Sequence, residues 1–109
     1  MYEYNATLLK VVDGDTLDAK IDLGFNIFIK KRIRLINIDA PEVRTTNMEE
    51  KKKGKRAKAF LKKVLKKNNS KFILKSHGFG KFGRCLGEIF INNRSVNDML
   101  LNEGLVTRY

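Results

Sequence analysis

The sequence predicts a mainly β fold of the α+β class: a five-stranded barrel with one helix between strands three and four and a second helix near the C-terminal end. Two observations support this prediction. Five short stretches rich in Val, Ile and Leu are bounded by turn residues, and two other stretches repeat apolar residues at helical spacing. A chain of 109 residues fits one domain, which we place at residues 1–109.

The first three strands form a predicted meander. Residues 2–12 and 16–23 alternate apolar and polar side chains, and Asp13-Gly14 between them is a hairpin signal. A second turn at 22–26 leads into a long strand at about 27–38. We therefore expect three antiparallel neighbours in chain order.

The second half of the chain contains both predicted helices. Polar residues at 43–53 lack periodicity and predict a loop, whereas the stretch 54–67 carries an apolar stripe at i, i+3, i+4, i+7 and i+8 (Ala57, Phe60, Leu61, Val64 and Leu65). Strands are expected at 71–76 and 85–91, joined by a Gly-rich loop at 77–84 that includes His77. Ser95 and Asp98 resemble a capping box, and Gly104 ends the short helix. The tail 105–109 is too short to predict another element.

This order, three strands, a helix, two strands and a helix, is that of an OB-type Greek-key barrel. Such barrels bind oligonucleotides or oligosaccharides. Fold alone does not decide the chemistry.

Composition narrows the possible partners. The formal net charge is +11, and ten of the 23 basic residues lie within 51–67. Such a field attracts nucleic acid or an acidic membrane surface, although a solvated basic helix face explains the run equally simply. No apolar run is long enough to span a membrane, and the first residues lack the features of a signal peptide, so we expect a soluble chain unless a leader has been removed. Cys85 is the sole cysteine, which excludes an internal disulfide and favours a strand residue over a nucleophile.

Charged residues gather where the third strand ends. Arg34, Asp39 and Glu42 lie in the stretch RLINIDAPE, in which Pro41 stops the strand. Crowded carboxylates repel each other unless a cation or a proton joins them, so the group indicates a metal site; a surface salt bridge beside a turn is the alternative. Asp13 suits a turn for backbone reasons, but Asp15 opens the second strand, where no turn needs a charge.

Four motifs together resemble the staphylococcal nuclease (thermonuclease) family. They are VDGDT at 12–16, RLINIDAPE at 34–42, KFGRCL at 81–86, and the pair VN at 96–97 with EGL at 103–105. The resemblance extends over about residues 4–107, and the order and spacing of the motifs make it specific. It implies an OB barrel with a Ca²⁺-dependent phosphodiesterase site.

The resemblance also implies a role for each matching position. Asp15, Asp39 and the backbone carbonyl of Ala40 would be Ca²⁺ ligands, and Glu42 would act on the attacking water as general base or by orienting it. Four of the remaining positions would bind the substrate: Arg34 and Arg84 the phosphate being cleaved, Lys81 a nucleotide phosphate, and Tyr109, near a stacking position, the nucleotide base. Asp13 and Thr16 would support the Ca²⁺ ligands without binding the ion themselves. Ala40 stands where the family more often has Thr. This difference is tolerable if only the backbone carbonyl of the residue binds the ion.

The physical chemistry of these residue types agrees with the implied roles. Ca²⁺ prefers several oxygen ligands, and two guanidinium groups can neutralise the charge that develops on a phosphodiester during hydrolysis. Three hypotheses remain: a low-specificity endonuclease acting on DNA and/or RNA and leaving 3′-phosphates, a non-catalytic OB module that binds nucleic acid, and a basic interaction or membrane-surface domain. Because the apolar stripe of the 54–67 helix is needed for the core, we expect no membrane partner. A small self-contained barrel also suggests a monomer.

Overall fold

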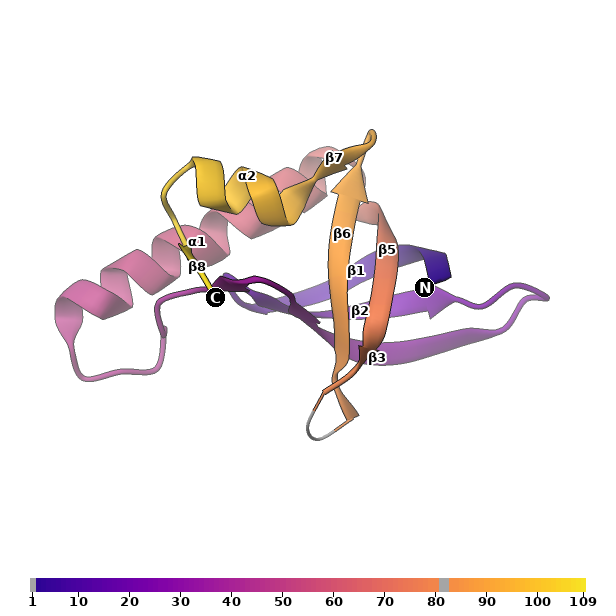
Figure 1. The fold of residues 1–109 in the computed structure, drawn as a ribbon, viewed down its shortest axis with the longest axis horizontal. Helices are drawn as coiled ribbons and strands as arrows, with labels where there is room; N and C mark the ends of the chain where they lie inside the picture. The colour runs from indigo at the N-terminus through magenta and orange to yellow at the C-terminus, as the bar shows by residue number, and fades with distance from the viewer. Residues whose placement is uncertain (1, 81–82) are drawn as a thin grey trace.

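The computed structural model describes residues 2–80 and 83–109 and contains the expected five-stranded barrel (Figure 1). Strands β1 (Tyr2–Asp13), β2 (Thr16–Asp22) and β3 (Phe28–Leu35) form the meander, and β5 (Lys71–Phe79) and β6 (Cys85–Ile91) complete the wall. The strand order is β3-β2-β1-β5-β6, and a parallel pairing of β3 with β6 closes the barrel. The predicted fold class is confirmed.

Strand β3 is shorter than predicted. It stops at Leu35, because Asn37 adopts a left-handed conformation (φ 63°) that turns the chain into the short strand β4 (Ile38–Asp39). Asparagine tolerates this conformation better than most residues. The expected continuous strand at 27–38 was therefore wrong at its end, and the turn brings Asp39 back towards Arg34.

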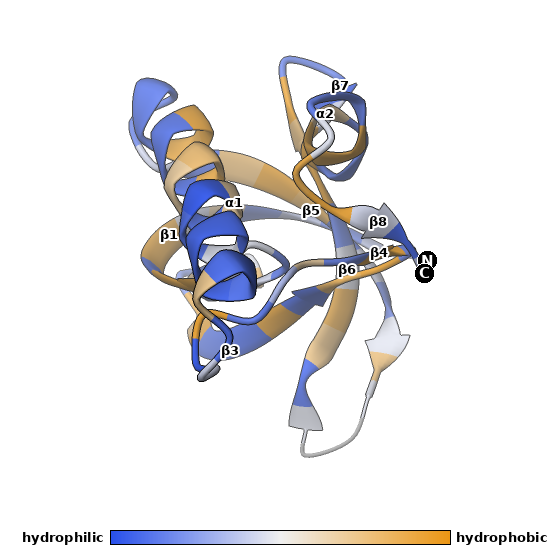
Figure 2. Cartoon of the chain, turned by 90° about the vertical axis from the view of Figure 1, so that its left-hand side faces the viewer, coloured by the Kyte–Doolittle hydropathy of each residue, from blue (hydrophilic) through white to orange (hydrophobic). Residues whose placement is uncertain are grey.

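Helix α1 (Met48–Lys67) begins earlier than predicted. Asn47 is its N-cap, with a side-chain oxygen that accepts hydrogen bonds from the backbone N–H groups of Glu49 and Glu50 at 3.1 and 3.2 Å. The predicted loop at 43–53 was wrong for its second half because the first helical turns are mostly exposed and show no apolar stripe. The buried residues of α1 include Ala57, Leu61 and Leu65, whereas most of its lysines are exposed. Figure 2 shows the helix as mainly hydrophilic, with hydrophobic segments recurring along it.

The C-terminal part contains two short strands that were not predicted. Strand β7 (Arg94–Ser95) precedes helix α2 (Val96–Asn102), which Ser95 caps by accepting a hydrogen bond from the Asp98 N–H at 3.2 Å. The tail then forms strand β8 (Thr107–Arg108), which pairs antiparallel with β4. The expectation that the tail adds no element was wrong, since its two-residue strand is stabilised by a partner distant in sequence.

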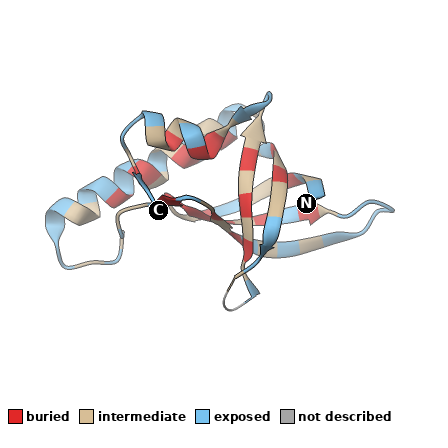
Figure 3. Cartoon of the chain, in the orientation of Figure 1, coloured by how far each residue is buried: buried red, intermediate tan, exposed pale blue. Residues whose placement is uncertain are grey.

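The core fills the barrel and the space beneath both helices (Figure 3). Its fully buried members come from strands and helices alike: Leu17, Ile33, Leu35, Ile38, Leu61, Leu65, Leu74, Ile89, Val96 and Leu100. Cys85 is also buried, as a strand residue. His77 was expected in a loop but lies in β5, which extends to Phe79. Within the described residues, neither helix has the length and apolar character needed to cross a membrane.

Candidate active site

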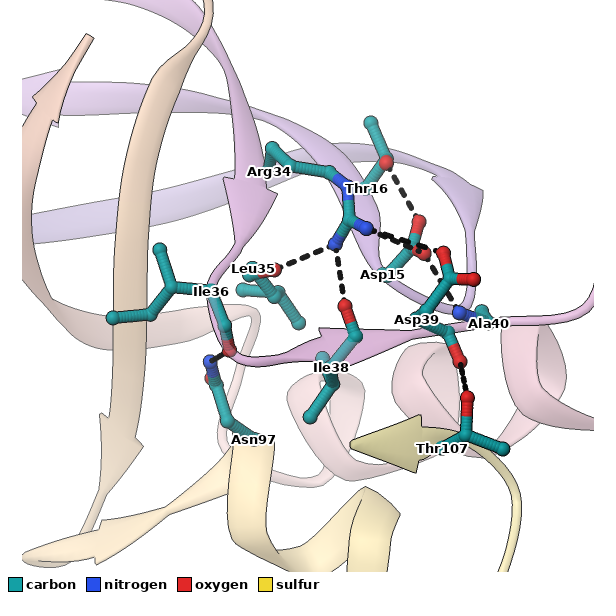
Figure 4. A network of polar contacts seen from close by, with 10 residues as sticks. All are labelled: Asp15, Thr16, Arg34, Leu35, Ile36, Ile38, Asp39, Ala40, Asn97 and Thr107. Atoms are coloured by element: carbon teal, nitrogen blue, oxygen red, sulfur yellow. Dashed lines mark hydrogen bonds and ion pairs between the residues drawn. The ribbon is translucent and has the colours of Figure 1, made fainter. Parts of the chain in front are cut away.

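Arg34 joins two acids that are far apart in the sequence (Figure 4). Its Nη2 atom lies 3.4 Å from Oδ2 of Asp15 and 3.3 Å from Oδ1 of Asp39. Asp15 was predicted to open the second strand but lies in the turn directly before β2, because Asp13 already pairs with Thr16 across a two-residue turn. Arg34 lies opposite Thr16, one residue before the end of β3, and Asp39 ends β4. The structure therefore brings together three of the residues singled out in the sequence.

Backbone carbonyls fix the orientation of the Arg34 guanidinium. Its Nη1 atom donates to the carbonyl oxygens of Leu35 at 2.6 Å and Ile38 at 3.0 Å. Both bonds depend on the turn at Asn37, which brings Ile38 back beside the end of β3. The side chain is only 17% exposed, so this planar fork is held in one position before any ligand arrives.

The two carboxylates differ in their surroundings. Asp15 is buried, and its oxygens accept hydrogen bonds from the Thr16 hydroxyl and the Ala40 N–H, both at 2.8 Å. The side chain of Asp39 is 55% exposed, and Arg34 is its ion-pair partner. Asp15 therefore connects the start of β2 to the chain leaving β4, whereas the Asp39 carboxylate remains accessible from solvent.

A neighbouring pocket contains the other predicted residues. Asp13, Thr16, Glu42 and Arg84 line it together with Arg32 and Arg44. Thr16 belongs to both groups, because its hydroxyl donates to Asp15. The two sets of side chains thus adjoin at the start of β2, while Asp39 and Ala40 line a separate pocket towards α1.

Arg84 carries an unused donor. Its Nε atom is buried and has no hydrogen-bond partner among the described residues. A buried N–H without an acceptor costs free energy, which a bound anion would recover. This is the kind of donor that a phosphate-binding role requires.

The pKa of Asp13 is shifted by its surroundings, which include Asp15. Burial, followed by the negative charge of Asp15, raises the pKa of the Asp13 carboxyl above its ordinary value, while Lys58 and Arg44 act in the opposite direction. The acid was expected behind the ligands, and it lies in the pocket wall near them.

Two glycines allow helix α1 to pack closely on the site. A Cβ atom at Gly54 would lie 2.7 Å from the carbonyl oxygens of both Pro41 and Glu42, and one at Gly14 would lie 2.5 Å from Cβ of Ala57. Such separations are shorter than van der Waals contact, so only glycine fits. Helix α1 thereby sets the position of the Glu42 backbone and of the β1–β2 turn.

Only one of the two predicted nucleotide-binding residues can be placed in the structure. Lys81 lies outside the described residues. Tyr109 follows β8, and its N–H donates to the carbonyl of Asn37 at 3.0 Å. Its ring is exposed, with its centroid 5.9 Å from Cζ of Arg34. Tyr109 is therefore beside the site, with a ring face available to a ligand.

Sequence reasoning assigned no role to two supporting residues, although Asn97 belongs to one of the quoted motifs. The Thr107 hydroxyl donates to the Asp39 carbonyl at 3.3 Å, and the buried Asn97 amide donates to the carbonyl of Ile36 at 3.1 Å (Figure 4). Asn97 could have been noticed as an amide next to the apolar residues of α2. Thr107 carries no comparable signal, because its role depends on the β4–β8 pairing.

The donor chemistry here suits a hard cation. No three or more His, Cys, Asp or Glu side chains cluster tightly enough to hold a metal within residues 2–80 and 83–109. Asp15 and Asp39 nevertheless each place a carboxylate oxygen within 3.4 Å of the same Arg34 nitrogen, and the Ala40 N–H donates to Asp15, so the predicted oxygen ligands come from neighbouring residues. Oxygen ligands of this kind fit Ca²⁺ and do not fit softer metals.

Comparison with known proteins gives the same family as the sequence motifs. A family model described as "Staphylococcal nuclease homologue" matches residues 32–109. The chain is 32% identical over 96 residues to a thermonuclease of Staphylococcus intermedius, covering 88% of this chain and 54% of that protein. It is 32% identical over 115 residues to endonuclease YhcR of Bacillus subtilis (strain 168), covering 98% of this chain and 9% of that protein.

A third relative is protein ParB of Escherichia coli, 26% identical over 116 residues, which cover 98% of this chain and 58% of that protein. The chain thus spans little more than half the length of these relatives, or less. The family match includes Arg34, the turn at Asn37, Asp39, helix α1 and the β4–β8 pairing, but not Asp15, which lies before residue 32. By its sequence and its fold, this chain belongs to the staphylococcal nuclease homologue family.

Proposed function

We propose that the protein is a Ca²⁺-dependent endonuclease that hydrolyses phosphodiester bonds of DNA and/or RNA with low sequence specificity and leaves 3′-phosphates. The observation that carries this proposal is the meeting of Asp15, Arg34 and Asp39 beside a pocket that Glu42 and Arg84 line. Family membership and the printed names of the thermonuclease and endonuclease relatives support it. The net charge of +11 suits a polyanionic substrate.

Asp15, Asp39 and the Ala40 carbonyl would hold the ion, which when bound neutralises charge on a phosphoryl oxygen. The accessible Asp39 carboxylate and the more enclosed Asp15 carboxylate approach this position from two strands. Asp13 and Thr16 would support Asp15, Thr16 through its hydrogen bond to the carboxylate.

Arg34 and Arg84 would bind the phosphate from two sides. Arg34 is held by backbone carbonyls, so its fork needs little rearrangement, and the buried Nε–H of Arg84 has no acceptor among residues 2–80 and 83–109. Fixed donors of this kind act where negative charge increases in the transition state. Lys81 and Tyr109 would contact the nucleotide, Tyr109 through its exposed ring.

Glu42 would accept a proton from the attacking water, or orient that water, at its carboxylate oxygens. It lines the same pocket as Arg84, so a water held by Glu42 would face a phosphate held by the arginine. Asp13, in the same wall, has a raised pKa and is less suited to carry the negative charge.

Plasmid nicking tests the proposal. We expect cleavage with Ca²⁺, none with EGTA, and a rate lower by about 10²–10³ for Glu42→Gln and for Arg84→Ala, the range for losing one stabilising group. Glu103→Gln, at an exposed acid after α2, is the matched control and should cut at the wild-type rate. Cleavage in EGTA, or full activity of Glu42→Gln, would refute the mechanism.

The alternative function is a non-catalytic nucleic-acid-binding module. A gel-shift measurement in parallel with the nicking assay distinguishes the two functions. Binding without cleavage under every metal condition would favour the module, whereas cleavage that follows Ca²⁺ favours the enzyme.

A further inference from the structure

The hairpin between β2 and β3 exposes apolar side chains at its tip. Residues 23–28 project at the end of the molecule opposite the start of α1 (Figure 1), and Figure 3 shows the tip as exposed. Phe25 is 97% exposed, Ile27 55%, Phe28 48% and Leu23 40%. These side chains add little to the core, so their apolar character needs another explanation.

The backbone at the tip gives a second, independent indication. Gly24, Phe25 and Asn26 all have positive φ, at 84°, 55° and 60°, and the Ile27 N–H donates to the Gly24 carbonyl at 2.9 Å. Glycine and asparagine suit such a turn, but a phenylalanine is strained there. Folding alone would favour Gly or Asn at position 25, so this ring is retained against the preference of its own backbone.

A basic strip connects this tip to the active site. The β2–β3 ladder places Thr16 opposite Arg34, Asp18 opposite Arg32, Lys20 opposite Lys30 and Asp22 opposite Phe28, and directly opposed residues share one face of the sheet. Asp18 is ion-paired with Arg32 at 2.8 Å, so this face carries four basic side chains against two acids. The strip therefore runs from the site along the outer face to Phe28, roughly 20 Å at the rise of a strand.

The pairing of Lys20 with Lys30 is unfavourable by itself. Like charges directly opposite each other destabilise a ladder, whereas an anion lying across them removes the repulsion. Lys20 also places its Nζ 4.7 Å from the centroid of the Phe28 ring, so a cation and an aromatic face lie together next to the tip.

We propose that the outer face of the β2–β3 hairpin, from Arg34 to Phe25, binds a single strand of nucleic acid beyond the bond being cut. Phosphates lie along Lys20 and Lys30, and bases stack on Phe25 and Phe28. Aromatic rings combined with a track of positive charge are the features that bind single strands without sequence preference. This inference rests on the proposed function, since it supplies the substrate of that same site.

Charge favours nucleic acid over a lipid surface as the occupant. A membrane would contact the apolar tip alone, whereas the lysine pair lies further along the strands, on the face that leads to Arg34. A flexible polyanion can follow that face from the tip to the site.

Phe25→Gly is the decisive variant, because glycine adopts a positive φ without strain. We expect it to unfold at the same or a higher temperature than wild type, and yet to bind a fluorescein-labelled single strand of about 20 nucleotides about tenfold more weakly. Fluorescence anisotropy in EGTA measures this affinity with cleavage prevented. Tyr2→Ala removes another exposed aromatic ring, from the start of β1, and should change the affinity much less.

A charge variant tests the strip separately. Lys20→Gln combined with Lys30→Gln should make the slope of log affinity against log salt shallower by about 1.4, at about 0.7 per phosphate contact. Lys62→Gln with Lys63→Gln removes the same charge from the exposed face of α1 and should reduce the slope less.

Unchanged affinity in Phe25→Gly, or an unchanged salt slope in the lysine pair variant, would overturn the inference. So would Phe25-dependent binding to phosphatidylserine vesicles with unaltered oligonucleotide binding, which would make the tip a lipid contact. If wild type binds the oligonucleotide through this face but never cuts it, the proposed function fails, and only the single-strand binding by this face stands.

Discussion

Substituting Gly54 with alanine should slow cleavage by displacing Glu42, although Gly54 itself has no contact with the substrate in the proposed mechanism. The added Cβ would lie 2.7 Å from the carbonyl oxygens of Pro41 and Glu42 and 2.9 Å from the carbonyl carbon of Glu42. Ordinary contact is longer by roughly half an ångström or more, so the Glu42 backbone must move away by about that amount. Because a displacement of about 1 Å in an active site can cost about 100-fold in rate, we expect a loss of about tenfold in kcat.

Stability should change less than activity in this variant. Alanine favours a helix interior by about 1 kcal/mol over glycine, which offsets part of the roughly 1–3 kcal/mol that overpacking costs. The net effect is a destabilisation between about zero and 2 kcal/mol, measured by urea unfolding. Lys55→Ala, at the neighbouring exposed position of α1, controls for alanine in the helix and should keep wild-type kcat.

A double-mutant cycle distinguishes a local displacement from general damage. If Gly54 acts through Glu42, the substitution should cost much less in a Glu42→Gln background than in wild type, because the side chain it displaces has already lost its role. Wild-type kcat in Gly54→Ala, or the same tenfold loss in both backgrounds, would refute the reasoning.

Three further outcomes can be measured without an activity assay. Asn97→Leu leaves the Ile36 carbonyl and the backbone N–H of residue 89 without their buried partner, so urea unfolding should show a loss of about 2–4 kcal/mol; a loss below 1 kcal/mol would contradict this. Burial raises the pKa of the Cys85 thiol, so iodoacetamide at neutral pH should modify the native protein far more slowly than the urea-unfolded chain. The Asp18 carboxyl has a lowered pKa, chiefly through its hydrogen bond from Arg32, so its stabilisation is present above about pH 4 and is lost as the pH falls further. Asp18→Asn should therefore reduce stability at neutral pH by at most about 1 kcal/mol and have less effect at pH 3.

The sequence alone determined the order of the five barrel strands and the two helices, and the identity of the charged residues. Alternating strands, a tight turn at Gly14 and the stripe from Ala57 to Leu65 are local patterns, although the turn lies one residue later than predicted, at Gly14 and Asp15. Arg34 and Asp39 are close in sequence, so their shared position at a strand end could also be predicted.

Only the tertiary structure decided how these residues meet. Asp15 reaches Arg34 because β2 pairs with β3, and Asp39 does so because Asn37 reverses the chain, which a strand pattern cannot reveal. Thr107 reaches Asp39 through a pairing between segments nearly seventy residues apart. Hydrogen bonds and packing between such distant segments depend on the whole fold, whereas helix and strand periodicity depend on neighbours a few residues away.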